Sequence, residues 1–194
     1  MGHGHYIAPP RGQYQVGEGQ KLDLQFVTLP GESHDFDITI DLTGPGAEVN
    51  LRGLYICGGS DKVRFRVVMH HMAPGCVSRQ NFRGIVFGDA DVRFEGTIIV
   101  APEAQQTDAT QENHSILLST GARAESQPQL EIYADDVKCS HGSTVGRLDE
   151  EARFYMRSRG IPEQEARTLQ ILSFLSGVTP EDRAEEIENA VRSL

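Results

Sequence analysis

The sequence predicts a mainly β fold that ends in helices. Between residues 22 and 101, short segments rich in Val, Ile and Phe alternate apolar with polar residues and are separated by clusters of Gly, Asp, Pro or Ser. Near Asp149 the apolar period changes from two to about 3.6 residues, which is typical of helices. A chain of 194 residues is long enough for one packed domain. We therefore expect a flexible N-terminus over residues 1–20, a β core over 21–147 and C-terminal helices over 148–194.

The expected strands of the first half follow one another closely. They cover residues 22–29, 36–44, 49–57, 62–71, 82–88 and 92–101. A motif of an apolar residue, Arg or Glu, and Gly recurs in LRGLYI, FRGIVF and FEGTII, which indicates stacked units that bury their inner rows against each other. A two-sheet sandwich has a similar number of strands, so the pattern alone leaves a solenoid and a sandwich open.

The C-terminal residues predict three helices. Asp149 is a good N-cap for the first, with acidic residues in the first turn and Gly160 beyond the end. Pro162 opens a strongly apolar second helix, and Thr179 with Asp182 resembles the capping-box start of a third. The apolar middle helix needs a surface that covers it.

Composition and missing motifs exclude several classes of function. A formal charge of −10 and a pI near 5.1 argue against a general nucleic-acid-binding surface. The sequence contains neither a phosphate-binding or dinucleotide-binding glycine motif nor a G-x-S-x-G or H-E-x-x-H hydrolase motif. A β-helical carbohydrate-active enzyme is also disfavoured, because the chain has no Trp and only 7% aromatic residues. Nucleotide hydrolysis, dinucleotide chemistry and standard hydrolase triads therefore have no local support, and we expect a partner to supply any energy that is needed.

The cysteines and the apolar pattern predict the compartment. Cys57, Cys76 and Cys139 are an odd number without a C-x-x-C spacing, so we expect reduced thiols rather than a disulfide framework. No apolar run reaches the roughly 18 residues of a membrane span, and the first residues lack the pattern of a signal peptide. These observations predict a soluble, cytoplasmic protein.

Two residues near the end of the β core have the chemistry of metal ligands. Cys139 and His141 are two positions apart on an expected strand, so their side chains share one face. Thiolate and imidazole together suit a soft metal ion. For an isolated pair the commoner role is structural, with Cys139 as a small buried residue and His141 as a core or turn histidine. The residues alone leave both roles open.

Two further groups are weaker candidates. His70 and His71 face opposite sides of an expected strand, so only one of them can join a site with Cys76. We consider a metal-ligand role for His71 or Cys76, but a turn or packing role is the default expectation. Glu112 and His114 resemble a metal-binding or acid–base pair. In their polar surroundings, however, we expect them to be solvated or to form a ladder of side-chain hydrogen bonds.

A long stretch of the chain resembles a known family. The run QPQLEIYADDVKCSHGSTVGRLDEEARFYMRSRGI, residues 127–161, is similar to the C-terminal signature of the SufB/SufD family of SUF iron–sulfur cluster assembly, and specifically to its SufD branch. The likeness extends to residues 94–119 and more loosely to 70–84. It implies a right-handed parallel β-helix in which residues 102–128 are solenoid strands. Gln106 and Ser143 depart from the residues common in the family, and we expect a short form that lacks the N-terminal helical region.

The resemblance also implies a function, which is that of a non-catalytic scaffold component of iron–sulfur cluster assembly. Family members pair through their β-helices, and their C-terminal helices dock an ABC-type ATPase, SufC. By resemblance, His141 and Cys139 are expected to bind iron or an iron–sulfur cluster at the pairing interface, with His71 as a weaker metal ligand. Residues 162–194 are expected to dock SufC, and the pairing partner is a SufB-like protein or a second copy. A β-solenoid homodimer that binds a metal ion or carries a cluster without SufC is the alternative.

Overall fold

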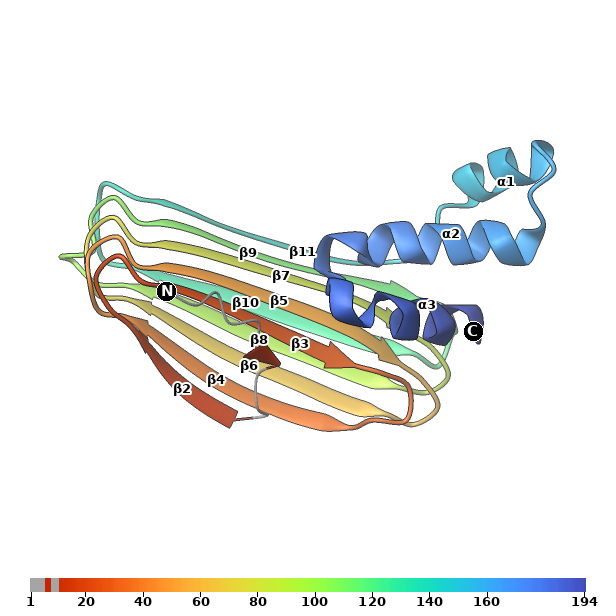
Figure 1. The fold of residues 1–194 in the computed structure, drawn as a ribbon, viewed down its shortest axis with the longest axis horizontal. Coiled ribbons are helices and arrows are strands. Elements are labelled where there is room, and N and C mark those ends of the chain that lie inside the picture. The colour runs from red at the N-terminus through yellow and green to blue at the C-terminus, as the bar shows by residue number, and fades with distance from the viewer. Residues whose placement is uncertain (1–5, 8–10) are drawn as a thin grey trace.

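The computed structural model describes residues 6–7 and 11–194 and is a parallel β-solenoid followed by helices (Figure 1). The predicted parallel β-helix is therefore confirmed, and the sandwich alternative is excluded. The strands are β1 (Tyr6–Ile7), β2 (Arg11–Val16), β3 (Lys21–Thr28), β4 (His34–Leu42), β5 (Glu48–Cys57), β6 (Lys62–His71), β7 (Val77–Val86), β8 (Asp91–Val100), β9 (Asp108–Leu117), β10 (Arg123–Ile132) and β11 (Lys138–Gly146). The helices are α1 (Glu150–Ser158), α2 (Glu163–Leu175) and α3 (Ala184–Arg192), with short 3₁₀ turns η1 (Ser176–Val178) and η2 (Glu181–Arg183).

Odd-numbered and even-numbered strands form two facing parallel sheets. Their orders are β1-β3-β5-β7-β9-β11 and β10-β8-β6-β4-β2. Each strand pairs with the strand two elements later, so that Leu51 lies beside Gln80 and Gln80 beside Gln111. The chain completes about five turns. Residues at equivalent positions of successive turns therefore lie side by side.

One strand of the solenoid lies before the expected start of the β core. Strand β2 pairs along β4 and lies within residues 1–20, for which the sequence predicted a flexible N-terminus. Residues 1–5 and 8–10 of that range lie outside the described residues. Strands β9 and β10 occupy most of residues 102–128, as the family resemblance implied.

An aromatic stack fills the space between the two sheets. Its ring centroids lie between 4.7 and 6.1 Å from their neighbours, and burying such rings is the main stabilising contribution of the core. The stacked residues are Phe26, Phe36, Phe65, Phe82 and Phe94.

The glycines of the recurring strand motif make room for large rings. Gly53 on β5 lies beside Phe82 on β7, and Gly84 on β7 lies beside Tyr55 on β5. A Cβ atom at Gly53 would overlap the Phe82 ring, and one at Gly84 would overlap the Tyr55 ring. The motif therefore marks close packing between successive turns.

A second apolar core joins the helices to the outer face of the six-stranded sheet. Helices α2 and α3 lie over this face in Figure 1, whereas α1 projects away from it. The apolar side of the middle helix is thus buried against this sheet. None of the described helices is long and apolar enough to cross a membrane. The core contains Val27, Leu54, Ile56 and Ile85 from the strands and Ile171, Leu175, Val178, Ile187 and Val191 from the helical segment.

Polar side chains from the sheet bind the C-terminal end of α2 and the turn η1 that follows it. Arg83 Nη1 donates to the Phe174 carbonyl at 2.8 Å, and Gln25 Nε2 donates to the Val178 carbonyl at 3.1 Å. Carbonyl groups at a helix end lack partners within the helix, so these bonds stabilise the docked position.

The start of α1 agrees with the sequence prediction, whereas the start of the last helix does not. Asp149 caps α1, accepting hydrogen bonds from two backbone N–H groups of the first turn, as predicted. The capping box expected from Thr179 is wrong, because Thr179 Oγ1 donates to the Leu175 carbonyl at 3.0 Å instead. The turn η2 precedes α3, which has no side-chain cap.

Gly84→Ala should destabilise the protein strongly, because the added methyl group overlaps the buried Tyr55 ring. We expect a loss of about 3 kcal/mol in the free energy of unfolding, measured by chemical denaturation. Gly146→Ala is the matched control, since nothing lies within 4 Å of a Cβ there, and it should change stability by less than about 0.5 kcal/mol. Equal stabilities of the two variants would contradict the packing described.

Candidate interface site at the open end of the solenoid

Cys139 and His141 lie on β11, the last strand of the six-stranded sheet. Among the described strands, β11 pairs only with β9, and β10 is likewise the last strand of the five-stranded sheet. The final turn of the solenoid is therefore an open end. An unpaired strand edge presents free N–H and C=O groups to which another chain can add a strand.

Both side chains belong to the inward-facing row of this last turn. The register places Cys139 beside Ala109 and His141 beside Gln111, and both neighbours are buried in the interior. Cys139 is half-buried and packs against the main core, whereas His141 is exposed. The predicted common face is therefore confirmed.

Apolar side chains of the last turn accompany them at the open end. Leu130 and Val137 pack partly against the main core. Ile132 is 40% exposed and Val145 is 46% exposed, although their positions in earlier turns are buried. An exposed apolar row at the end of a solenoid is typical of a surface that another molecule covers.

Burial sets the protonation of the cysteines. Burial, assisted by the charge of Asp108, raises the pKa of Cys139 above its ordinary value, although a backbone hydrogen bond from Ala109 opposes the shift. Cys139 is therefore a thiol at neutral pH, and a metal has to displace its proton. All three cysteines are free, as predicted, and burial also raises the pKa values of Cys57 and Cys76 in the core.

His70 and His71 face opposite sides of β6, as predicted. His70 Nδ1 lies 2.7 Å from Asp41 Oδ1 on the outer face. His71 is fully buried, and its Nε2 lies 2.9 Å from Ser78 Oγ. Burial lowers the pKa of His71 to about 4, so this imidazole is neutral at physiological pH.

Glu112 and His114 form a ladder on the outer face of β9. His114 Nε2 lies 3.0 Å from Glu112 Oε2, and His114 Nδ1 lies 2.7 Å from Thr144 Oγ1 on β11. Both imidazole nitrogens are thus engaged, and the Thr144 contact joins the last two strands of the sheet, which is the ladder role expected from the sequence.

The described residues contain no group of three or more His, Cys, Asp or Glu side chains arranged to hold a metal ion. At the open end, Cys139 and His141 supply one thiolate and one imidazole. This donor set suits iron and iron–sulfur clusters, which are usually held by four protein ligands.

Sequence reasoning missed two interior residues near this site, Gln80 and Gln111. Each is 1% exposed, and they occupy the positions of His141 in the two preceding turns. The signal was present, because both stand at inward-facing positions of the strand alternation in VSRQNF and ATQENH.

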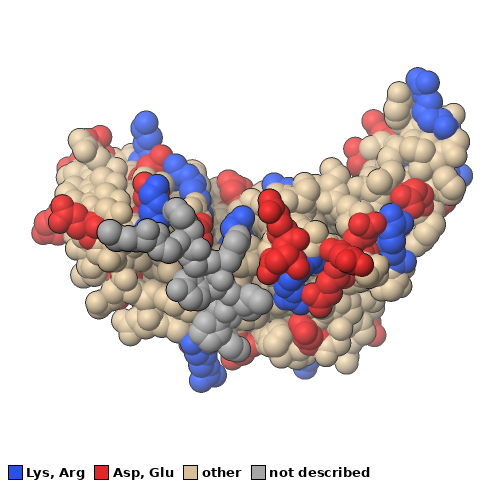
Figure 2. Space-filling view, in the orientation of Figure 1, with Lys and Arg blue, Asp and Glu red and all other residues tan. Residues whose placement is uncertain are grey.

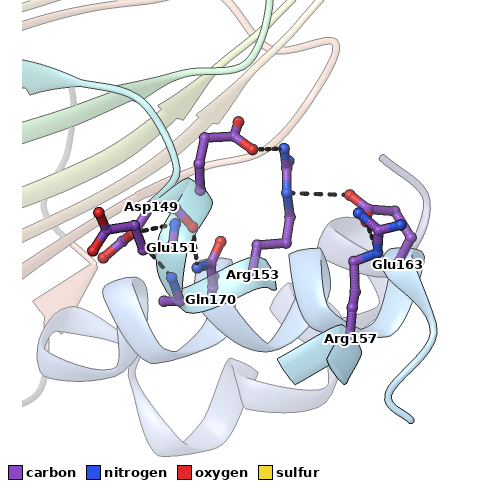
Figure 3. Close-up of polar contacts among 8 residues, drawn as sticks. Asp149, Glu151, Arg153, Arg157, Glu163 and Gln170 are labelled. Carbon is purple, nitrogen blue, oxygen red and sulfur yellow. Dashed lines mark hydrogen bonds and ion pairs between the residues drawn. The ribbon is translucent and has the colours of Figure 1, made fainter. Parts of the chain in front are cut away.

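Ion pairs and a hydrogen bond join α1 to α2 (Figure 3). Arg153 Nε lies 3.1 Å from Glu163 Oε1, and Arg157 Nε lies 2.9 Å from Glu163 Oε2. Gln170 Nε2 of α2 donates to the Asp149 carbonyl at 2.8 Å. Exposed ion pairs contribute little stability individually, but here they connect two consecutive helices and set the direction of α1.

Helix α1 projects from the body of the molecule (Figures 1 and 2) and contributes no buried residue. Phe154 is 71% exposed and Tyr155 is 59% exposed. Between α1, α2 and the sheet lies an open groove with apolar side chains from Ile116, Leu148, Met156, Leu169 and Phe174. Large exposed aromatic residues beside an apolar groove are typical of a protein-binding surface.

The fold is that of a β-solenoid protein with an open end and a C-terminal helical segment. The model of the family described as SUF system FeS cluster assembly, SufBD core domain, matches residues 10–174. The chain therefore belongs to the SufBD core domain family of the SUF system, which confirms the resemblance noted in the sequence.

Curated relatives agree with this membership. The chain is 36% identical over 171 residues to a SufBD family protein of Mycobacterium leprae, and the match covers 84% of this chain and 44% of the relative. It is 39% identical over 150 residues to the iron–sulfur cluster assembly protein SufD of Escherichia coli (77% and 36%) and 30% identical over 156 residues to SufD of Bacillus subtilis (80% and 36%). The chain thus spans less than half the length of these relatives.

His71→Leu should change how stability depends on pH. The folded pKa of about 4 lies below the ordinary value of 6.5, so the unfolded chain binds the proton more tightly. The stability from the neutral, buried imidazole is complete above pH 6.5 and is lost as pH falls toward 4. The wild type should lose about 3 kcal/mol relative to the variant between pH 7 and pH 4, measured by denaturation. A constant difference between the two proteins would contradict the buried neutral state.

Proposed function

We propose that this chain is a scaffold subunit of iron–sulfur cluster assembly that pairs with a second SufBD-family subunit through the open end of its solenoid. The observation that carries the proposal is the position of Cys139 and His141 on the edge strand β11, beside the exposed side chains of Ile132 and Val145. A second solenoid seated there would pair with the free strand edge and cover the apolar row.

The proposed ligands of iron or of a transferred cluster are His141 and Cys139. The cluster is cargo rather than a resident cofactor, and the partner chain supplies the remaining ligands. The partner is a SufB-like protein or a second copy of this chain. We leave His71 out of the ligand set, because it is fully buried and hydrogen-bonded to Ser78.

We propose further that the α1–α2 surface docks an ABC-type ATPase of the SufC kind, which performs the ATP hydrolysis. The sequence pointed to residues 162–194 for this contact. Much of the apolar surface of α2 and α3 is used against the chain's own sheet, which leaves the exposed aromatic residues of α1 and the adjoining groove for a partner. The chain itself is a non-catalytic, cytoplasmic component in this proposal.

His141→Ala should weaken anaerobic Fe²⁺ binding by the paired protein at least about tenfold, because an imidazole ligand is lost. It should also reduce cluster maturation in cells while leaving pairing intact, as measured by analytical ultracentrifugation. Ser143→Ala, two positions along the same row, is the control and should behave like the wild type. Unchanged iron binding and maturation in His141→Ala would remove His141 from the site.

The double variant Phe154→Ser, Tyr155→Ser should lose association with a SufC-type ATPase by about tenfold or more, measured by calorimetry. Its stability should stay within about 0.5 kcal/mol of the wild type, because both side chains are exposed. Tyr133→Ser, which removes an aromatic side chain 62% exposed on the solenoid, is the control. Association retained by the double variant would place the docking surface elsewhere. A wild-type protein that pairs and binds iron but does not bind the ATPase would favour the stand-alone homodimer.

A further inference from the structure

A column of side chains inside the solenoid changes from apolar to polar toward the open end. Leu24, Leu51, Gln80, Gln111 and His141 occupy matching positions on five successive strands of the six-stranded sheet, from β3 to β11. The two leucines lie in the main core, and the two glutamines separate them from His141.

The two amides are buried without a full set of hydrogen bonds. Each glutamine is 1% exposed. Within the part of the chain that the structure describes, Gln80 Nε2 and Oε1 and Gln111 Oε1 have no hydrogen-bond partner. A buried polar atom without a partner destabilises a fold, so a leucine would pack better at either position. The column therefore points to a role beyond packing.

The facing sheet leaves space for the Gln111 amide and holds one end of it. Gln111 Nε2 donates to the Gly96 carbonyl on β8 at 3.3 Å. A Cβ atom at Gly96 would overlap this amide, so the third glycine of the strand motif makes room for it. Because Gln111 Nε2 is engaged with the facing sheet, Gln111 Oε1 is the atom of this amide that remains available as an acceptor.

The next inward polar side chains on β9 are already engaged. Asn113 Oδ1 accepts a hydrogen bond from the Tyr55 hydroxyl at 3.1 Å, and Ser115 Oγ lies 2.7 Å from the same hydroxyl. Gln111 Oε1 is thus an uncommitted acceptor, and it belongs to the residue directly beside His141 in the ladder.

We propose that Gln111 is a positioning residue for His141. Its Oε1, which has no partner in the structure, accepts a hydrogen bond from one imidazole N–H when the His141 ring turns toward it, so that the other nitrogen presents its lone pair at the open end. An imidazole that binds a metal through one nitrogen carries a proton on the other, and an acceptor for that proton sets the tautomer and the ring orientation. The proposal rests on the proposed function in one respect, which is that His141 is a ligand.

The tautomer of His141 tests the hydrogen bond directly in the full chain. Ring ¹⁵N chemical shifts, assigned by comparison with His141→Ala, should show one dominant tautomer in the wild type. Gln111→Met keeps the length of the side chain but removes the acceptor, and it should shift the tautomer ratio toward that of free imidazole. Gln111→Glu keeps an oxygen acceptor and should restore the wild-type pattern. Thr110→Val, on the outward face of β9, is the control. A folded Gln111→Met variant with unchanged ring shifts would overturn the proposal, and Gln111→Leu repeats the test if Gln111→Met does not fold.

Anaerobic Fe²⁺ titration separates this inference from the proposed function. Gln111→Met should weaken Fe²⁺ binding by about 10- to 100-fold, with rescue by Gln111→Glu. If His141→Ala weakens binding but Gln111→Met changes neither affinity nor ring shifts, only the positioning role is wrong. If His141→Ala leaves binding unchanged, the proposed ligand role is wrong, whereas the ring shifts still decide whether Gln111 holds the imidazole.

Discussion

The parallel hydrogen-bond ladder between successive turns determines where the side chains of this solenoid lie. Because each strand pairs with the strand two elements later in a fixed register, every inward position repeats the same location in the next turn. The aromatic stack, the glycines that face Tyr55 and Phe82, and the amide column under His141 all follow from this register. A slip of one residue would turn every inward side chain outward, so the packing and the ladder stabilise each other.

The same ladder explains why the site lies at an end of the molecule. Side chains of an inner turn are covered by the turns on either side, whereas those of β10 and β11 have a neighbouring turn on one side only. His141 is therefore exposed although Gln111 and Gln80 at the same position are buried. The helical segment does not cover this row, because it packs on the outer face of the six-stranded sheet. The molecule thus has two separate exposed surfaces, the open end and the α1–α2 surface.

Local signals in the sequence predicted the elements whose causes are local. The cap at Asp149 and the common face of Cys139 and His141 depend on residues within a few positions, and both are confirmed. Thr179 misled the prediction, because its hydroxyl is engaged with the preceding Leu175 carbonyl rather than with the following turn. The polar strand β9 has little intrinsic strand preference, so only the family resemblance identified it.

The sequence by itself determined the mainly β fold, the change to helices near Asp149 and, through family resemblance, the solenoid and its Cys139–His141 signature. The tertiary structure alone decided that the apolar helix α2 packs on its own sheet, that His71 is buried and that Gln111 lies beside His141. The physical reason is the distance along the chain. Contacts within a turn or a cap are encoded by neighbouring residues, whereas contacts between turns join residues about 30 positions apart, whose partners no local pattern reveals.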